Sequence, residues 1–268
     1  MIINPYSFGV AYDPDAQAFI TAAGITDNTQ KSAINTLVLD MKGFGIWTKM
    51  KAIYPFVGGT ATTHKFNLKN PLDTDAAFRL VFNGGWTHSA NGALPNGTNG
   101  YADTKFNVNL FNANINSYSL GIYLNSVLIT SNRYHTGTAG GSANQAVGLR
   151  VNTSSTKTGY LESTILPLVK TGLTTITQQG FWAISKRATN DRAMICSDGT
   201  FIYNTGAGSI AQNSNIIFLG AQNANGTPAN YDTMSHAFDF FADGLNDTEM
   251  TNLRTAIITF QTSLSRQV

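Results

Sequence analysis

The segment that decides the fold is Ser117-Tyr118-Ser119-Leu120-Gly121-Ile122-Tyr123-Leu124. Large apolar side chains stand at every second position, namely Tyr118, Leu120, Ile122 and Leu124. Successive side chains of a β-strand point to opposite faces, so a period of two gathers these four on one face. The segment therefore predicts a strand with one face in a hydrophobic core.

Similar short segments recur throughout residues 46–245, separated by turns rich in Gly and Asn. The strand candidates are Phe78–Phe82, Ala146–Val151, Gly180–Ser185, Ile216–Leu219 and Ala237–Phe241. A hairpin is expected where 192–196 and 200–204 flank Ser197-Asp198-Gly199, because the glycine can adopt the positive φ that tight hairpin turns require. Many short strands with such turns predict a mainly β protein built as an antiparallel jelly-roll sandwich.

Helices are expected only at the two ends of the chain. Residues 13–44 carry apolar side chains at helical spacing in two runs, the second starting at Asp27 as the N-cap with Gln30 three positions later. The closing helix 246–265 begins with the same capping-box pattern, Asn246 and Glu249. We divide the chain into a helical segment 1–45, which packs on the sandwich or attaches it to a partner, and a sandwich over 46–268. Packing within the same chain is the favoured alternative.

The composition excludes several classes of protein. Only 12% of the residues are charged and the net charge is +2, against about 25% charged residues in typical domains. This charge does not favour nucleic-acid binding, which relies on a basic field. No apolar run approaches the roughly 20 residues that cross a bilayer, so membrane insertion is not expected, and the N-terminus does not resemble a signal peptide. The lone Cys196 predicts a buried core residue in a protein that folds in a reducing cytoplasm.

Catalytic patterns are missing from the sequence. Of the two glutamates, Glu249 is explained as a helix cap and Glu162 has no acidic neighbour two residues away. Asp73 and Asp75 have that spacing, but they follow Pro71 in an expected turn. Sugar hydrolysis on a sandwich needs two facing carboxylates, so the sequence does not predict an enzyme.

Metal ligands are also scattered. The histidines His64, His88, His135 and His236 have no metal-binding spacing. Asp239 and Asp243 are candidate ligands for Ca²⁺, which prefers carboxylate and carbonyl oxygens. The alternative, that such residues serve as turn formers, is favoured, and no cofactor other than this candidate Ca²⁺ is expected.

The long polar segment 84–101 is the candidate carbohydrate site. It contains two aromatic rings, a histidine and several amides: Trp86, His88, Asn91, Asn96, Asn99 and Tyr101. Aromatic rings stack on the CH face of a sugar while amides hydrogen-bond its hydroxyls. The competing interpretation, which we favour, is an ordered Ω-loop whose Trp and Tyr lie partly in the core and whose Asn and Thr side chains stabilise it.

Three segments resemble virion proteins of tailed bacteriophages, especially those infecting Bacteroidetes and including crAss-like phages. They are residues 50–61, 64–80 and 92–104. The ending Asp243-Gly244-Leu245-Asn246-Asp247-Thr248-Glu249, with its helix and 264–266, resembles the closing segment of their concanavalin A-like (laminin G-like) domains. The resemblance implies a jelly-roll sandwich on the particle surface and carries over no catalytic residues.

The sequence therefore favours a non-enzymatic virion structural protein: a capsid decoration, a head fibre or a tail-associated protein. The alternative is a carbohydrate-binding module for receptor recognition on a phage tail or fibre, and a glycan hydrolase is the least favoured. The resemblance implies other virion proteins as partners, a homo-oligomer and a host surface glycan as a further candidate. It also implies location in the virion after folding in the host cytoplasm.

Overall fold

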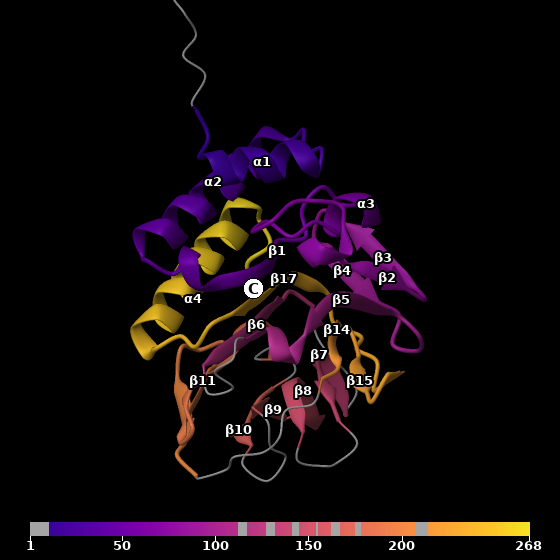
Figure 1. Ribbon diagram of the computed structural model, residues 1–268, viewed down its shortest axis with the longest axis vertical. Coiled ribbons are helices and arrows are strands. Elements are labelled where there is room, and N and C mark those ends of the chain that lie inside the picture. Colours follow the sequence, from indigo (N-terminus) through magenta and orange to yellow (C-terminus); the bar gives the residue numbers. More distant parts are fainter. Residues whose placement is uncertain are drawn as a thin grey trace, which may run out of the picture.

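Two β-sheets stack face to face, and helices cover the outer face of one of them (Figure 1). The computed structural model describes residues 11–111, 117–126, 132–140, 145–153, 155–161, 167–174, 178–206 and 214–268. The predicted fold class, a mainly β sandwich of antiparallel sheets with an N-terminal helical segment and a C-terminal helix, is confirmed.

The first sheet has eight strands in the order β13-β12-β11-β6-β17-β4-β3, with β1 also paired to β17. Its strands are β1 (Met50–Tyr54), β3 (Trp86–Ser89), β4 (Gly92–Pro95), β6 (Tyr118–Leu124), β11 (Gly180–Ala188), β12 (Asp191–Ile195), β13 (Phe201–Asn204) and β17 (His236–Ala242). The predicted hairpin around 197–199 forms between β12 and β13, with Gly199 at φ 83°.

The second sheet has nine strands, and seven of them follow the order β10-β9-β8-β7-β14-β5-β2. Its strands are β2 (Val81–Asn83), β5 (Tyr101–Asn107), β7 (Arg133–Ala139), β8 (Ala146–Thr153), β9 (Thr156–Leu161), β10 (Leu168–Lys170), β14 (Ile216–Leu219), β15 (Gln222–Ala224) and β16 (Thr227–Ala229). A parallel pairing joins β15 to β7.

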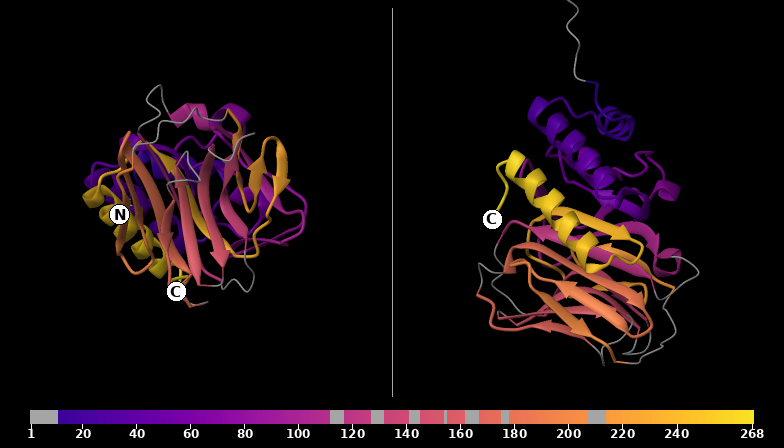
Figure 2. Two further views of the ribbon diagram at one scale, coloured as in Figure 1. Left: turned by 90° about the horizontal axis from the view of Figure 1, so that it is seen from below. Right: turned by 90° about the vertical axis from the view of Figure 1, so that its left-hand side faces the viewer.

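The helices are α1 (Pro14–Ala22), α2 (Asn28–Gly43), the short α3 (Ala61–His64) and α4 (Asp247–Ser263), with 3₁₀ turns at Trp47–Lys49, Asp75–Ala77 and Val108–Phe111. Seen from the side, α1, α2 and α4 form a third layer over the eight-stranded sheet (Figure 2). The capping box of α4 is present, since Asn246 and Glu249 each accept from the other's backbone N–H. In α2, Asp27 caps as predicted, but Oε1 of Gln30 accepts from the N–H of Gly58 and so ties the helix to a distant loop.

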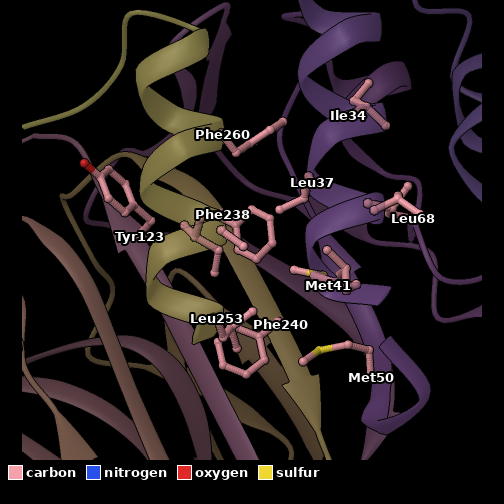
Figure 3. Packing of buried hydrophobic residues seen from close by; sticks show 14 of the residues in the cluster. Ile34, Leu37, Met41, Met50, Leu68, Tyr123, Phe238, Phe240, Leu253 and Phe260 are labelled. Atoms are coloured by element: carbon pink, nitrogen blue, oxygen red, sulfur yellow. The ribbon is translucent and has the colours of Figure 1, made fainter. Parts of the chain in front are cut away.

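Strand β6 lies at the centre of this arrangement and is buried on both faces. Tyr118, Leu120, Ile122 and Leu124 face the core between the sheets, as the alternation predicts. Tyr123 faces the other way, into a second core formed with the helices. Figure 3 shows this second core, where side chains of α2 and α4 meet Phe238 and Phe240 of β17. The segment 11–45 thus packs within its own chain.

One predicted strand is wrong in part. Only Val81–Asn83 forms a strand, while Phe78 adopts a left-handed φ of 59° at the end of a 3₁₀ turn. Asp75 and Arg79 pair across this turn at 3.0 Å, and Tyr54 donates its hydroxyl hydrogen to the carbonyl of Phe78. The ion pair within the turn and the hydrogen bond from the distant Tyr54 replace the strand pairing that the apolar run suggested.

Candidate functional site

The segment 84–101 is a β-hairpin followed by a turn and not one long loop. Strands β3 and β4 pair from Trp86↔Pro95 to Ser89↔Gly92, at the edge of the sheet beside α3 (Figure 1). The dipeptide Asn91-Gly92 marks the region of this hairpin but not its register, because the turn residues are Ala90 and Asn91 and Gly92 already pairs with Ser89. Gly92 has φ 133°, and a Cβ there would lie 2.2 Å from the carbonyl oxygen of His236, so glycine is required.

Trp86 and His88 point to the inner side of the hairpin, into an aromatic cluster. Their rings stack with centroids 6.2 Å apart, and both contact Phe82. Nδ1 of His88 lies 2.9 Å from Nδ1 of buried His64 in α3. Burial lowers the pKa of His64 to about 3 and also lowers the pKa of His88. Both rings are therefore neutral at pH 7, and they serve as core groups of the hairpin.

Asn96 and Asn99 hold the turn that follows the hairpin. Oδ1 of Asn96 accepts from the N–H groups of Thr98, Asn99 and Gly100 at 3.0, 3.1 and 3.0 Å. Oδ1 of Asn99 accepts from Nδ2 of Asn96 at 2.8 Å and from the N–H of Gly85 at 3.0 Å. For these two residues the structure matches the favoured alternative, in which the segment's own amides stabilise it.

Replacing Asn96 with alanine is expected to lower the free energy of unfolding by about 1–2 kcal/mol, because three backbone donors lose their acceptor. The matched control is Asn91→Ala, since within the described residues the side chain of Asn91 has no hydrogen-bond partner. This control should change stability by less than about 0.5 kcal/mol. Urea unfolding of both variants checks the prediction, and equal losses would contradict it.

The six predicted sugar-binding residues do not form one surface. Tyr101 starts β5 in the other sheet and packs on Phe218 at a centroid distance of 4.7 Å. Asn91 is exposed in the hairpin turn, on the outer side with Thr87 and Ser89. The outer side of the hairpin is thus separated from Trp86 and His88 by the strand itself, because neighbouring side chains of a strand point to opposite faces.

A groove of about 360 Å³ runs along this outer side, and we call it the hairpin groove. Hydroxyl and amide side chains dominate its lining: Thr87, Ser89, Asn91, Asn125, Ser126, Ser235, Ser265 and Gln267. Leu94, exposed by 37%, adds an apolar contact. Arg266 also borders the groove, but its guanidinium is buried and donates to the carbonyls of Phe56 and Pro55. The groove therefore presents neutral hydrogen-bonding groups.

A second, larger pocket of about 530 Å³ lies between α4, the start of β11 and the β12–β13 turn. We call it the α4 pocket. Tyr123, Phe181 and Ile258 are among its apolar groups, and Lys170, Asp198 and Arg254 are its charged side chains. Sequence reasoning missed this pocket because its walls come from segments more than a hundred residues apart.

The fold brings together histidines that are scattered in the sequence. His135 and His236, with Asp232 and Asp239, form a fully buried network: Nδ1 of His135 lies 2.6 Å and Nε2 of His236 lies 3.3 Å from Oδ2 of Asp232. Nδ1 of His236 also lies 2.8 Å from Oδ2 of Asp239. The ring of His236 contacts Phe56, which contacts His64 in turn.

Burial and charge separate the pKa values within this network. Burial lowers the pKa of His135 to about 4, despite the neighbouring Asp232. Burial also opposes charge on His236, but Asp239 and the hydrogen bonds to both aspartates outweigh it and raise the pKa of His236 to about 10. The histidines hold Asp232 ionised, with a pKa well below its usual range, against the opposing effect of burial. At pH 7 the network contains a charged His236 between two carboxylates.

The structure does not bring Asp239 and Asp243 together as calcium ligands. Four residues along an extended strand span about 13 Å. Asp239 is engaged with His236, and Asp243 pairs with Lys51 at 2.9 Å. Among the described residues, no group of three or more His, Cys, Asp or Glu side chains could hold a metal ion.

The remaining predicted residues are placed as follows. Cys196 is buried, and burial raises the pKa of its thiol, as expected for a core residue. Asp73 pairs with Lys65 and Arg79 on the surface, and Asp75 with Arg79. Glu162 lies outside the described residues. In the part of the chain that the structure describes, no helix is long and apolar enough to cross a membrane.

Comparison with known proteins places the chain by its fold. No family model and no curated protein matches the sequence. Domain 4 of the extracellular arabinanase AbnA from Geobacillus stearothermophilus, solved with arabinotriose, is similar in structure with a TM-score of 0.50 and 13% identity. This match covers 76% of the present chain and 98% of that domain.

Trypanosoma rangeli sialidase matches with a TM-score of 0.52 and 11% identity over 84% of the present chain. The matched region is 39% of the sialidase chain. At such identities the similarity shows the fold alone: this chain is a β-sandwich of the kind that occurs in domains of bacterial and trypanosomal glycosidases.

Proposed function

We propose that this protein is a carbohydrate-binding β-sandwich and that the hairpin groove binds a neutral oligosaccharide. The observation that carries the proposal is the lining of the groove, where hydroxyl and amide groups converge and the guanidinium of Arg266 is buried against backbone carbonyls. Sugar hydroxyls both donate and accept, and such side chains match them in both roles. Exposed Leu94 offers an apolar contact for a CH face of the sugar.

Several hydrogen-bonding side chains of the groove have no partner within the described residues, and those of Thr87 and Asn91 are two of them. Within the described residues, the side chains of Thr87 and Asn91 have no hydrogen-bond partner, although both are exposed and line the groove. Their neighbours Ser89 and Ser126 accept from backbone N–H groups and so hold the groove in shape. Thr87 and Asn91 are therefore the groups proposed to recognise a ligand.

The similar fold of the arabinanase domain supports this proposal, because that domain was solved with arabinotriose, an uncharged oligosaccharide. Binding without turnover is part of the proposal. Hydrolysis of a glycosidic bond uses a pair of carboxyl groups, and the described residues that line the groove include no Asp or Glu.

The double variant Thr87→Val/Asn91→Ala tests the groove. Calorimetric titration with arabinotriose, followed by an array of neutral oligosaccharides, should identify a ligand whose affinity falls about tenfold or more in the variant. Each hydrogen bond lost contributes about 0.5–1.5 kcal/mol. Thr227→Val, an exposed threonine on β16, is the matched control and should bind like the wild type. Equal affinity of the double variant, or no bound oligosaccharide, would contradict the proposal.

A second candidate function is a structural component of a bacteriophage particle. The resemblance of residues 50–61, 64–80 and 92–104 to virion proteins supports it. On this proposal the chain assembles with other virion proteins, as a homo-oligomer, and a surface glycan of the host is the ligand of the groove. A density map of the intact particle should then show the chain against other subunits, and its absence from purified particles would overturn this candidate.

A further inference from the structure

The α4 pocket has the properties of a separate binding site. Its cavity of about 530 Å³ falls in the size range of small-molecule sites. It is formed where α4 crosses the ends of several strands, so its walls belong to both sheets and to the helix layer. It shares Gln267 and Val268 with the hairpin groove but otherwise has its own lining.

The inner wall of the α4 pocket is apolar. Tyr123 of β6 and Phe181 of β11 are almost fully buried, and Leu173 is 9% exposed. Ile258 of α4, which is half-buried, also lines the pocket. Since Tyr123 and Phe181 are already almost out of water, a ligand with a compact apolar body would chiefly remove its own surface and that of Ile258 from water, which is favourable.

Of the three charged side chains in the pocket, two form an ion pair and the third, Arg254, has no carboxylate partner among the described residues. Lys170 and Asp198 neutralise each other, with Nζ 2.9 Å from Oδ2, and Thr200 accepts a second hydrogen bond from Lys170. Arg254 has no such partner among the described carboxylates. Its Nη2 donates to the carbonyl oxygen of Ser197 at 2.6 Å, and its buried Nε has no acceptor in the described part of the chain.

This arrangement leaves the charge of Arg254 uncompensated beside an apolar cavity. Arg79 pairs with Asp73 and Asp75, and Arg187 with Asp191 and Asp247, whereas buried Arg266, like Arg254, donates to carbonyl oxygens. A guanidinium binds carboxylates with two parallel hydrogen bonds, which gives both strength and orientation. A ligand carboxylate would give the guanidinium of Arg254 the carboxylate partner that it lacks among the described residues.

We propose that the α4 pocket binds a small monocarboxylate with a compact apolar body, and that Arg254 pairs with the carboxylate. The hydrocarbon part lies against Tyr123, Phe181 and Ile258. This site is distinct from the hairpin groove, with which it shares Gln267 and Val268, because Thr87 and Asn91 do not line it.

An NMR titration of the full chain with hexanoate tests this site. Hexanoate should perturb the signals of residues around Arg254 and Phe181, and hexan-1-ol, which lacks the charge, should bind at least tenfold more weakly. Arg254→Gln should weaken hexanoate binding at least tenfold, while the surface control Arg79→Gln should leave it unchanged. A charge-dependent contact predicts both differences.

A cavity-filling variant and a more polar carboxylate test the same site further. Ile258→Trp, which fills the cavity and retains Arg254, should abolish hexanoate binding without changing the hairpin groove. Glucuronate carries the same carboxylate on a polar body and should bind more weakly than hexanoate. Unchanged binding in Arg254→Gln, no perturbation by hexanoate, or preference for glucuronate would overturn the proposal.

Discussion

Replacing Asp232 with alanine is expected to lower the free energy of unfolding by about 3–5 kcal/mol, the cost of breaking a buried ion pair. Asp232 is fully buried and is the group that joins His135 to His236. Its Oδ1 also accepts from the N–H groups of Thr233 and Met234. Without the Asp232 carboxylate, Asp239 is the remaining carboxylate beside the charged His236, and two backbone N–H groups lose their acceptor.

Urea unfolding at pH 7 measures this loss. Asp73→Ala is the matched control, because Asp73 pairs with Lys65 and Arg79 on the surface, where ion pairs contribute about 0–1 kcal/mol. The Asp232→Asn variant keeps the size of the side chain and one acceptor oxygen. Its loss of unfolding free energy should therefore lie between the losses of Asp232→Ala and Asp73→Ala. If Asp232→Ala and Asp73→Ala destabilise the protein equally, the buried network does not contribute as the structure implies.

Acidification from pH 6.5 towards pH 4 is expected to destabilise the protein. The folded-state pKa values of His64 and His135 are lowered to about 3 and about 4 by burial, whereas an unfolded histidine titrates near 6.5. Between these pH values the unfolded state therefore binds more protons at these two histidines than the folded state does. Stability from these groups is present above pH 6.5 and is lost as the pH falls towards their folded pKa values.

Asp239 opposes this trend, because burial raises its pKa to about 6. Below that pH the folded state takes up one proton that the unfolded chain accepts only near pH 4. His88 is also shifted downward, so three histidines oppose the aspartate, while His236, whose pKa is raised to about 10, is protonated in both states below pH 6.5 and adds no slope there. The net loss is about 1.4 kcal/mol per pH unit for each excess proton bound by the unfolded state.

Urea unfolding at pH 7, 6, 5 and 4 measures the slope. His64→Gln retains a donor towards His88 and removes one of the titrating groups, so the variant should lose less stability on acidification than the wild type. A wild-type stability that stays constant or rises over this range would contradict the assigned protonation states.

The parts of the fold that local patterns encode could be predicted. The alternation in Ser117–Leu124 gave the inner face of β6, and Asn246 with Glu249 gave the start of α4. Both features depend on residues a few positions apart. The burial of the opposite face of β6 was not predictable in the same way, because helices from both ends of the chain cover it.

Local sequence patterns predicted less of the candidate site than of the fold. The low charge of the sequence is reflected in the hairpin groove, whose lining is mostly hydroxyl and amide side chains. The hairpin in 84–101 was missed because the polar composition suggested a loop and because its turn residues, Ala90 and Asn91, are not the Asn-Gly pair that marks a two-residue hairpin turn. The pairing of His135 with Asp232 spans 97 residues, and no local spacing encodes a contact of that range.

The most direct test of the central proposal is to map a bound neutral oligosaccharide on the protein by backbone amide chemical shifts. If the hairpin groove binds it, the largest shifts will lie in residues 87–94, 125–126, 235 and 265–267, and they will disappear in Thr87→Val/Asn91→Ala. Shifts confined to another surface, or none with any neutral oligosaccharide, would show that the groove does not recognise carbohydrate.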